Sequence, residues 1–154
     1  MSEIWRYFTK ILLAKRHKAI RNIYPQLEIF NFNLIGRNFI CDGFFDKENL
    51  EFLKRRVFPQ LGTTDICLDI GEKIGNHSVF YAKYFTDIYA FEPNLRAFKL
   101  LEANTMLKNN IQAFNFGLSN RKHSQSANFD AGNVGSASLV HKAPDGVTVQ
   151  FNLD

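Results

Sequence analysis

The fold is decided by one short stretch near the middle of the chain, Ile66-Cys67-Leu68-Asp69-Ile70-Gly71-Glu72-Lys73-Ile74-Gly75. Its first half is an apolar run with one acid near its end, which is typical of a buried strand, and its second half is a loop with glycine at both ends. A predicted helix begins at Asn76, and residues 88–91 form a second apolar run that ends at Glu92. Strand, glycine loop, helix and strand make a βαβ unit, which predicts parallel strands joined by a right-handed crossover.

The same unit predicts a ligand site, because ligands of parallel sheets lie at the carboxyl ends of the strands. Gly71, Gly75 and Glu92 would meet at that edge. Glycine lets the backbone approach a ligand closely, and the first turn of the helix offers free N–H groups to an anionic group. Glu92 lies 21 positions after Gly71, close to the roughly 20 positions at which an acid contacts ribose in dinucleotide-binding folds. Together these residues indicate a ligand that contains a nucleoside.

The spacing and charge of the loop favour one nucleoside over others. Dinucleotide sites read G-x-G-x-x-G, whereas this loop reads Gly71-x-x-x-Gly75, and the Gly-Lys-Ser/Thr of a P-loop does not follow it. Asp69 would repel a pyrophosphate but attract an amino or sulfonium group. S-adenosylmethionine carries a ribose, an amino-acid head and a positive sulfur, so it fits better than NAD. An NAD-binding oxidoreductase fragment stays as the less favoured alternative.

The stretch from Cys67 to Asn120 resembles the S-adenosylmethionine-dependent methyltransferases of the FkbM type. Those proteins typically read D-[IV]-G-A-N-x-G in the first loop, F-E-P-N-P after the second strand, and an A-L-S-D-like end to the third. The matching segments here are Asp69–Gly75, Phe91–Leu95 and Gly117–Asn120, with weaker similarity at Gly132–Leu139 and Phe151–Asp154.

The resemblance implies an α/β, Rossmann-like class I methyltransferase fold with S-adenosylmethionine as cofactor. It implies methyl transfer to a hydroxyl group of a sugar, glycan or other small metabolite. The residues that it assigns to the cofactor are Asp69, Gly71, Lys73 and Gly75 for the methionine part, Glu92, Pro93 and Asn94 for the ribose, and Gly117 and Leu118 for the adenine.

One departure from the family pattern lies inside the loop, where Glu72 and Lys73 replace the usual Ala-Asn pair. Lys73 could bind the carboxylate of the cofactor through a charge-assisted hydrogen bond. Glu72 would oppose that carboxylate if it pointed inward, so we expect it to face solvent. We expect Asn94 to cap the helix that follows it.

Three histidines follow the loop, and none is assigned a catalytic role. His77 is expected to pack or to cap the helix, His123 to lie in a turn, and His141 near a strand end. The catalytic residues stay unknown, and no metal site is predicted.

A second departure is that the chain stops at Asp154, before a family segment that resembles I-K-I-D-V-E-G. We therefore expect a fold truncated after the third parallel strand and a following β segment, with an unpaired edge on the first strand. Either residues 147–153 or another chain, in a homodimer or a complementary pair, would cover that edge. A non-catalytic nucleoside- or partner-binding remnant is accordingly a second functional hypothesis.

Residues 1–62 are predicted to precede the partial cofactor-binding domain, which would span residues 63–154. Residues 3–21 carry apolar side chains at helical spacing among clustered basic ones, which predicts an amphipathic helix with a solvated basic face. Residues 27–34 and 38–41 predict a β-hairpin, and Asp46 is expected to be the N-cap of the next helix.

The composition of the 154 residues bounds these hypotheses. Hydrophobic residues make up 45% and include 16 Phe, which favours one buried core and excludes intrinsic disorder. The longest apolar run near the start is too short for a membrane span or a signal peptide. Cys41 and Cys67 form no disulfide framework or metal cluster, which predicts a cytoplasmic location. The net charge of +4 permits acidic partners without requiring them, and nucleic acid is not expected.

Overall fold

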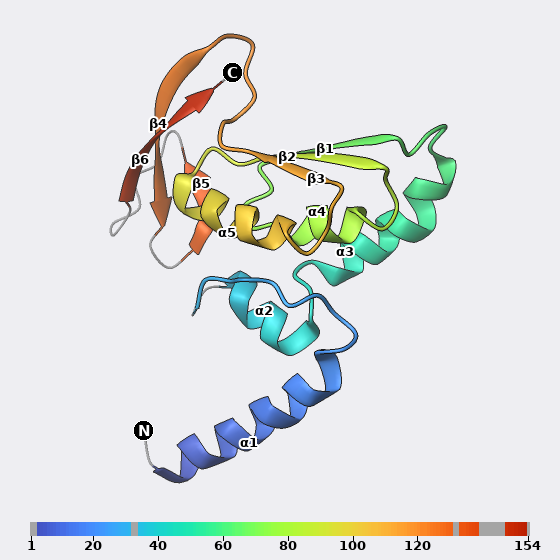
Figure 1. The fold of residues 1–154 in the computed structure, drawn as a ribbon. Coiled ribbons are helices and arrows are strands. Elements are labelled where there is room, and N and C mark those ends of the chain that lie inside the picture. Colours follow the sequence, from blue (N-terminus) through green and yellow to red (C-terminus); the bar gives the residue numbers. More distant parts are fainter. Residues whose placement is uncertain (1–2, 32–33, 131–132, 139–146, 154) are drawn as a thin grey trace.

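The computed structural model describes residues 3–31, 34–130, 133–138 and 147–153. It is a mixed α/β arrangement in which helices pack against a three-stranded parallel sheet beside a three-stranded antiparallel sheet (Figure 1). Several positions used in the sequence interpretation lie outside the described residues: residues 32–33 of the predicted hairpin, Gly132, Leu139, His141 and Asp154.

The parallel sheet confirms the predicted βαβ unit. Strands β1 (Ile66–Ile70), β2 (Asp87–Phe91) and β3 (Ile111–Phe114) lie in the order β1-β2-β3, with both neighbouring pairs parallel. Helix α4 (Asn76–Tyr81) connects the first two strands, and α5 (Leu95–Thr105) connects the second to the third. Ile70 pairs with Phe91, which pairs with Phe114, so the three strands end at one edge of the sheet.

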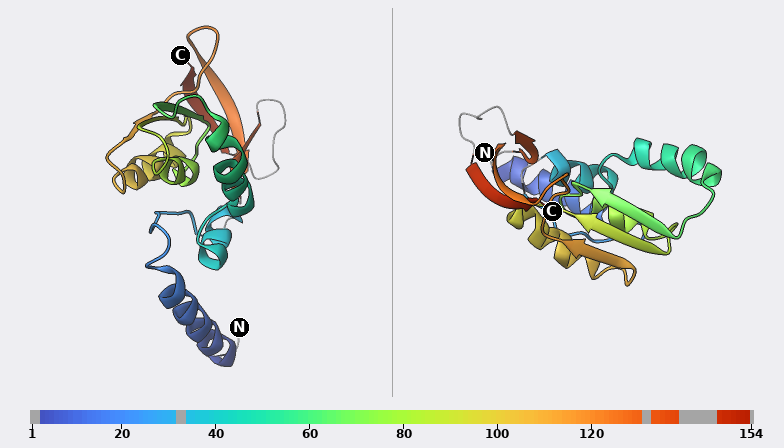
Figure 2. Two further views of the ribbon diagram at one scale, coloured as in Figure 1. Left: turned by 90° about the vertical axis from the view of Figure 1, so that its right-hand side faces the viewer. Right: turned by 90° about the horizontal axis from the view of Figure 1, so that it is seen from above.

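Helices cover one face of this sheet, because α4 and α5 both lie below it in Figure 1 and behind it when it is seen from above in Figure 2. Ile88 and Ala90 of β2 are fully buried, and Ala90 packs with Phe98 and Leu101 of α5. Ile66, Leu68 and Ile70 alternate with the helix-facing residues of β1 and are 58–62% exposed. The second face of β1 is therefore uncovered by the described part of the chain.

The antiparallel sheet has the order β5-β4-β6, formed by β4 (His123–Asp130), β5 (Asn133–Ser138) and β6 (Val147–Leu153). The expectation that residues 147–153 could cover β1 is wrong, because β6 pairs with β4 from His123↔Leu153 to Phe129↔Val147. β1 keeps an edge position, as predicted. The turn predicted at His123 is also wrong. His123 begins β4, and pairing with β6 holds this polar part of the chain in a strand.

The first helix, α1 (Glu3–Ile20), confirms the predicted amphipathic helix, and it extends away from the rest of the chain in Figure 1 and in the left-hand view of Figure 2. None of its residues is buried. Among the described residues, no helix has both the length and the apolar character that crossing a bilayer requires.

The predicted hairpin at residues 27–41 is wrong. Residues 25–30 have no regular secondary structure, and α2 (Leu34–Asp42) occupies the place of the returning strand. Ile35 and Phe39 are four residues apart and both buried, so helical spacing places them on one apolar face. Glu28 forms its backbone hydrogen bonds with the side chain of Asn104 on α5, so the extended segment needs no partner strand.

A third helix, α3 (Lys47–Phe52), continues through a π-helical turn, η1 (Leu53–Val57), and a 3₁₀ turn, η2 (Phe58–Gln60). Asp46 occupies the cap position of α3, but its side chain makes no capping hydrogen bond to the backbone, so the predicted cap is wrong in mechanism. Its backbone is left-handed (φ 58°), and its Oδ1 instead accepts a hydrogen bond from the Asn49 side chain at 2.7 Å.

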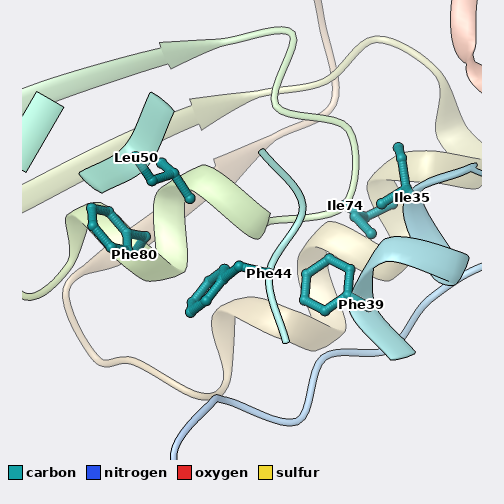
Figure 3. Packing of buried hydrophobic residues seen from close by; sticks show 6 residues of the cluster. All are labelled: Ile35, Phe39, Phe44, Leu50, Ile74 and Phe80. Atoms are coloured by element: carbon teal, nitrogen blue, oxygen red, sulfur yellow. The ribbon is translucent and has the colours of Figure 1, made fainter. Parts of the chain in front are cut away.

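The main hydrophobic cluster joins the N-terminal third of the chain to the loop after β1. Figure 3 shows its six buried members, contributed from both sides of residue 62: Ile35, Phe39, Phe44, Leu50, Ile74 and Phe80. The division at residue 62 stays a prediction, and the packing shows that residues on both sides of it stabilise the same core.

Candidate functional site at the carboxyl ends of β1 and β2

The loop after β1 has a left-handed backbone at three of its five positions. The φ angles are 79° at Gly71, 66° at Lys73 and 99° at Gly75. Glycine adopts this conformation freely, whereas Lys73 carries a strain of about 1–2 kcal/mol because its Cβ crowds the following carbonyl. The N–H groups of Gly71 and Glu72 both donate to the carbonyl oxygen of Phe91, at 2.9 and 3.2 Å. The loop is thereby attached to the end of β2.

Glu92 lies at the meeting point of this loop and the start of α5. Its Oε2 accepts a hydrogen bond from the Lys73 N–H at 3.0 Å, and its Oε1 accepts one from the Asn94 N–H at 2.6 Å. The prediction that Glu92 and the glycine loop meet at one edge is therefore confirmed. Burial raises the pKa of Glu92 to about 7, although these two N–H donors act to lower it.

The residues after Glu92 complete one side of this edge. The Asn94 side chain accepts a hydrogen bond from the Arg96 N–H at 3.0 Å, which confirms it as the N-cap of α5. A Cβ built on Gly117 would lie 3.5 Å from Pro93, so Gly117 borders the same wall. Leu118 follows it and is 41% exposed.

Asn115 also supports this wall, and the sequence interpretation missed it. Its side-chain amide donates to the carbonyl oxygens of Glu92 and Pro93, at 2.8 and 3.3 Å. No local motif marks Asn115, because its partners come from the neighbouring strand.

Glu72 contradicts the expectation that it faces solvent. It is 4% exposed, and its Oε1 accepts hydrogen bonds from the N–H groups of His77 at 2.7 Å and Ser78 at 3.1 Å. The first turn of α4 has free N–H groups and a partial positive charge, and both attract a carboxylate. The N–H groups that we expected to hold an anionic part of a ligand are therefore occupied by the protein's own side chain.

Asp69 lies on the helix-facing side of β1, next to Glu72. Its Oδ2 accepts a hydrogen bond from the Ser78 hydroxyl at 2.8 Å. Burial, together with the negative charge of Glu72, raises the pKa of Asp69 to about 8. A positive group beside this pair would favour its ionised form.

His77 packs as predicted, with its ring stacked on Tyr81 at a centroid distance of 6.0 Å. Its Nδ1 lies 3.4 Å from Glu72 Oε2, and its Nε2 lies 3.9 Å from Asp46 Oδ2. Burial acts to lower the pKa of His77, but the hydrogen bond and charge of Glu72, with the other nearby carboxylates, raise it above its ordinary value overall.

The sequence interpretation missed one further group of side chains. Asp69, Glu72 and His77 each contribute an atom of metal-ligand type, and these three atoms lie within 4.8 Å of one another. These three atoms come together because the Glu72 side chain turns inward, and the sequence gives little indication of that turn.

Comparison with known proteins gives no match to this chain among family models, curated proteins or solved structures.

Proposed function

We propose that the chain contains the cofactor-binding unit of an S-adenosylmethionine-dependent methyltransferase of the FkbM type, with a Rossmann-like fold. The observation that carries the proposal is the contact between Glu92 and the Lys73 N–H, at the common edge of the parallel strands. It joins the two segments most similar to the family pattern, Asp69–Gly75 and Phe91–Leu95.

The backbone at Lys73 supports this correspondence. The family pattern has Asn at this position, and Asn adopts a left-handed conformation more readily than most residues. Here Lys73 has that conformation, with φ of 66°. The same loop geometry would therefore suit either residue, and the ammonium group of Lys73 would provide the charge for the cofactor's carboxylate. Since Glu72 occupies the N–H groups at the start of α4, Lys73 is the better candidate for this contact.

The remaining contacts would divide between two acids. Each carboxylate oxygen of Glu92 accepts one hydrogen bond from the backbone, and each has a second lone pair for a ribose hydroxyl. Asp69 would face the positive amino or sulfonium group, which would favour its ionised form. Pro93 and Asn94 would shape the ribose wall, and Gly117 and Leu118 would border the adenine.

S-adenosylmethionine, when bound, supplies a methyl group on a positively charged sulfur. The residues described here would bind and orient the cofactor, and we assign no proton-transfer step to them. The methyl acceptor would be a hydroxyl group of a sugar, glycan or small metabolite, as the resemblance implies.

The NAD alternative is less favoured by the electrostatics of the loop. A pyrophosphate would need the N–H groups at the start of α4, and it would meet the carboxylates of Glu72 and Asp69 there.

A second candidate function, partner binding without catalysis, is supported by the uncovered face of β1. Leu68 is 58% exposed on this face, and Tyr89, Phe91 and Phe114 continue it across the sheet in matching register. β1 also has an open edge in the described chain. Under this proposal, a second copy or a complementary chain covers both.

Calorimetric titration of the full chain with S-adenosylmethionine, S-adenosylhomocysteine and NAD tests the proposed function. We expect the first two to bind and NAD not to bind. Glu92→Gln should weaken S-adenosylmethionine binding about tenfold or more, because the amide offers only one acceptor oxygen. Lys73→Ala should also weaken it, and Glu102→Gln on the exposed side of α5 is the control. Equal affinity for NAD, no binding of S-adenosylmethionine, or unchanged affinity in Glu92→Gln would overturn the proposal.

A further inference from the structure

The inward turn of Glu72 creates a cluster that the proposed function does not explain. Asp69 comes from β1, Glu72 from the loop and His77 from the first turn of α4, and one potential ligand atom from each lies within 4.8 Å of the other two. Glu72 and His77 are not among the residues assigned to the cofactor, so Asp69 alone is shared with that proposal.

Each carboxylate in the cluster is held by one oxygen and keeps the other. Asp69 Oδ2 accepts a hydrogen bond from Ser78, and Glu72 Oε1 accepts two from backbone N–H groups. Glu72 Oε2 is fully buried and makes no hydrogen bond of good geometry among the described residues, although His77 Nδ1 lies 3.4 Å from it. A buried carboxylate oxygen is stabilised by a positive partner, which here would be either the protonated ring of His77 or a metal ion that both side chains bind.

We propose that Asp69, Glu72 and His77 bind one divalent transition-metal ion, with Zn²⁺ as the best match. Two carboxylate oxygens and one imidazole nitrogen are hard and borderline ligands that Zn²⁺ accepts, and a three-ligand set leaves a fourth position for water. Zn²⁺ binds such atoms at about 2.0–2.2 Å, so neighbouring ligand atoms are about 3.4 Å apart in a tetrahedral site. The ligand atoms therefore need to approach one another by up to about 1.4 Å, through rotation of the side chains when the metal binds.

The groups around the cluster orient its ligands as an outer shell does in metal sites. Ser78 holds Asp69, and the N–H groups of α4 hold Glu72. The Nε2 of His77 lies 3.9 Å from Asp46 Oδ2, so this carboxylate is placed to attract the Nε2 proton when Nδ1 binds the metal. Tyr81 stacks on the ring and restricts its rotation. The metal would connect β1, the loop and α4 at one point.

The test is calorimetric titration of Zn²⁺ into the full chain after chelator treatment, without S-adenosylmethionine. We expect one Zn²⁺ per chain. His77→Ala and Glu72→Gln should each weaken binding at least about tenfold. His17→Ala, which removes an imidazole from α1, is the matched control and should bind as the parent does. Mn²⁺ and Mg²⁺ titrations rank the ions, and we expect both to bind more weakly than Zn²⁺.

A spectroscopic measurement keeps the test independent of folding. Co²⁺ in the parent should give the visible absorption of a four-coordinate site, and His77→Gln should lose it while its circular dichroism stays that of the parent. His77 is partly exposed, so this variant reports on the site even if Glu72→Gln does not fold. Glu92→Gln should bind Zn²⁺ as the parent does and bind S-adenosylmethionine more weakly, which separates the two proposals.

Three results would overturn the metal site. The first is the absence of saturable Zn²⁺ binding, in which case Asp69 and Glu72 would share a proton instead of a metal ion. The second is parent-like Zn²⁺ affinity in His77→Ala. The third is loss of Zn²⁺ binding in His17→Ala.

Discussion

The Glu92 carboxylate accepts a hydrogen bond from the Lys73 N–H at 3.0 Å, so the end of β2 stabilises the middle of the loop after β1. Lys73 has a left-handed backbone, and this bond helps to hold it there. The same carboxylate binds the Asn94 N–H before α5. One buried acid therefore couples the loop, β2 and α5.

This arrangement makes stability depend on pH. The pKa of Glu92 is about 7 in the folded chain, against an ordinary 4.5, so the native state holds a proton that the unfolded state has lost. The free energy of unfolding should therefore fall as pH rises from about 4.5 to about 7, by at most on the order of 3 kcal/mol from this group. The Lys73 ammonium opposes this effect and the Glu72 carboxylate adds to it.

Denaturant unfolding of the parent and Glu92→Gln across this pH range measures the effect. The free energy of unfolding should depend less steeply on pH in the variant than in the parent. The difference between the two slopes isolates Glu92, because the other acids are common to both chains. Glu102→Gln, on the exposed side of α5, should keep the parent's slope. Identical slopes in the parent and Glu92→Gln would contradict the prediction.

Gly75→Ala should destabilise the chain by about 1–3 kcal/mol. An alanine at position 75 would have to keep the left-handed backbone, with φ of 99°, which is strained for a residue with a Cβ. Its Cβ would lie 3.2 Å from Asn104 Cβ. Gly62→Ala is the matched control, since nothing lies within 4 Å of its Cβ position. Thermal unfolding should show a lower Tm for the first variant and a change within about 0.5 kcal/mol for the second. Equal effects would show that the loop relaxes around the new methyl group.

Asn104→Ala should destabilise the chain by about 2–4 kcal/mol, because it leaves buried backbone groups without partners. The Asn104 side chain bonds the N–H and carbonyl oxygen of Glu28 at 2.6 and 2.9 Å, and the carbonyl oxygen of Ile74 at 2.6 Å. It is the link between the extended segment at residues 25–30 and the loop after β1. Asn109→Ala, at an exposed position after α5, is the control for denaturant unfolding. A loss below about 0.5 kcal/mol in Asn104→Ala would argue against this link.

Leu68→Lys should reduce self-association of the chain, because it places a charge on the uncovered face of the edge strand. Sedimentation of the parent should show association that increases with concentration, and the variant should shift toward monomer. Leu107→Lys, which changes an exposed leucine just after α5, should associate as the parent does. A parent that stays monomeric at all concentrations would contradict this prediction.

Local pattern was enough for the central part of the fold. The apolar runs of β1 and β2 and the glycines between them predicted a βαβ unit, because parallel strands need a crossover and their carboxyl ends meet. The same rule predicts Glu92 beside the loop, where it accepts the hydrogen bond from the Lys73 N–H.

The sequence pattern gave wrong predictions where the position of a residue depends on packing or hydrogen bonds with other segments of the chain. Residues 27–34 alternate loosely and residues 38–41 looked like a returning strand, but the packing of Ile35 and Phe39 with Phe44 and Phe80 selects helical spacing. Glu72 looked like a solvated loop acid, yet the N–H groups of α4 draw it inward.

The amino-acid sequence by itself determined the parallel βαβ unit and the meeting of the loop with Glu92, because both follow from the order and periodicity of neighbouring residues. Only the tertiary structure decided the inward turn of Glu72, the helix in place of the hairpin and the pairing of β6 with β4. The reason is that each depends on a burial or hydrogen-bond partner that is remote in the chain or selected only when the elements pack.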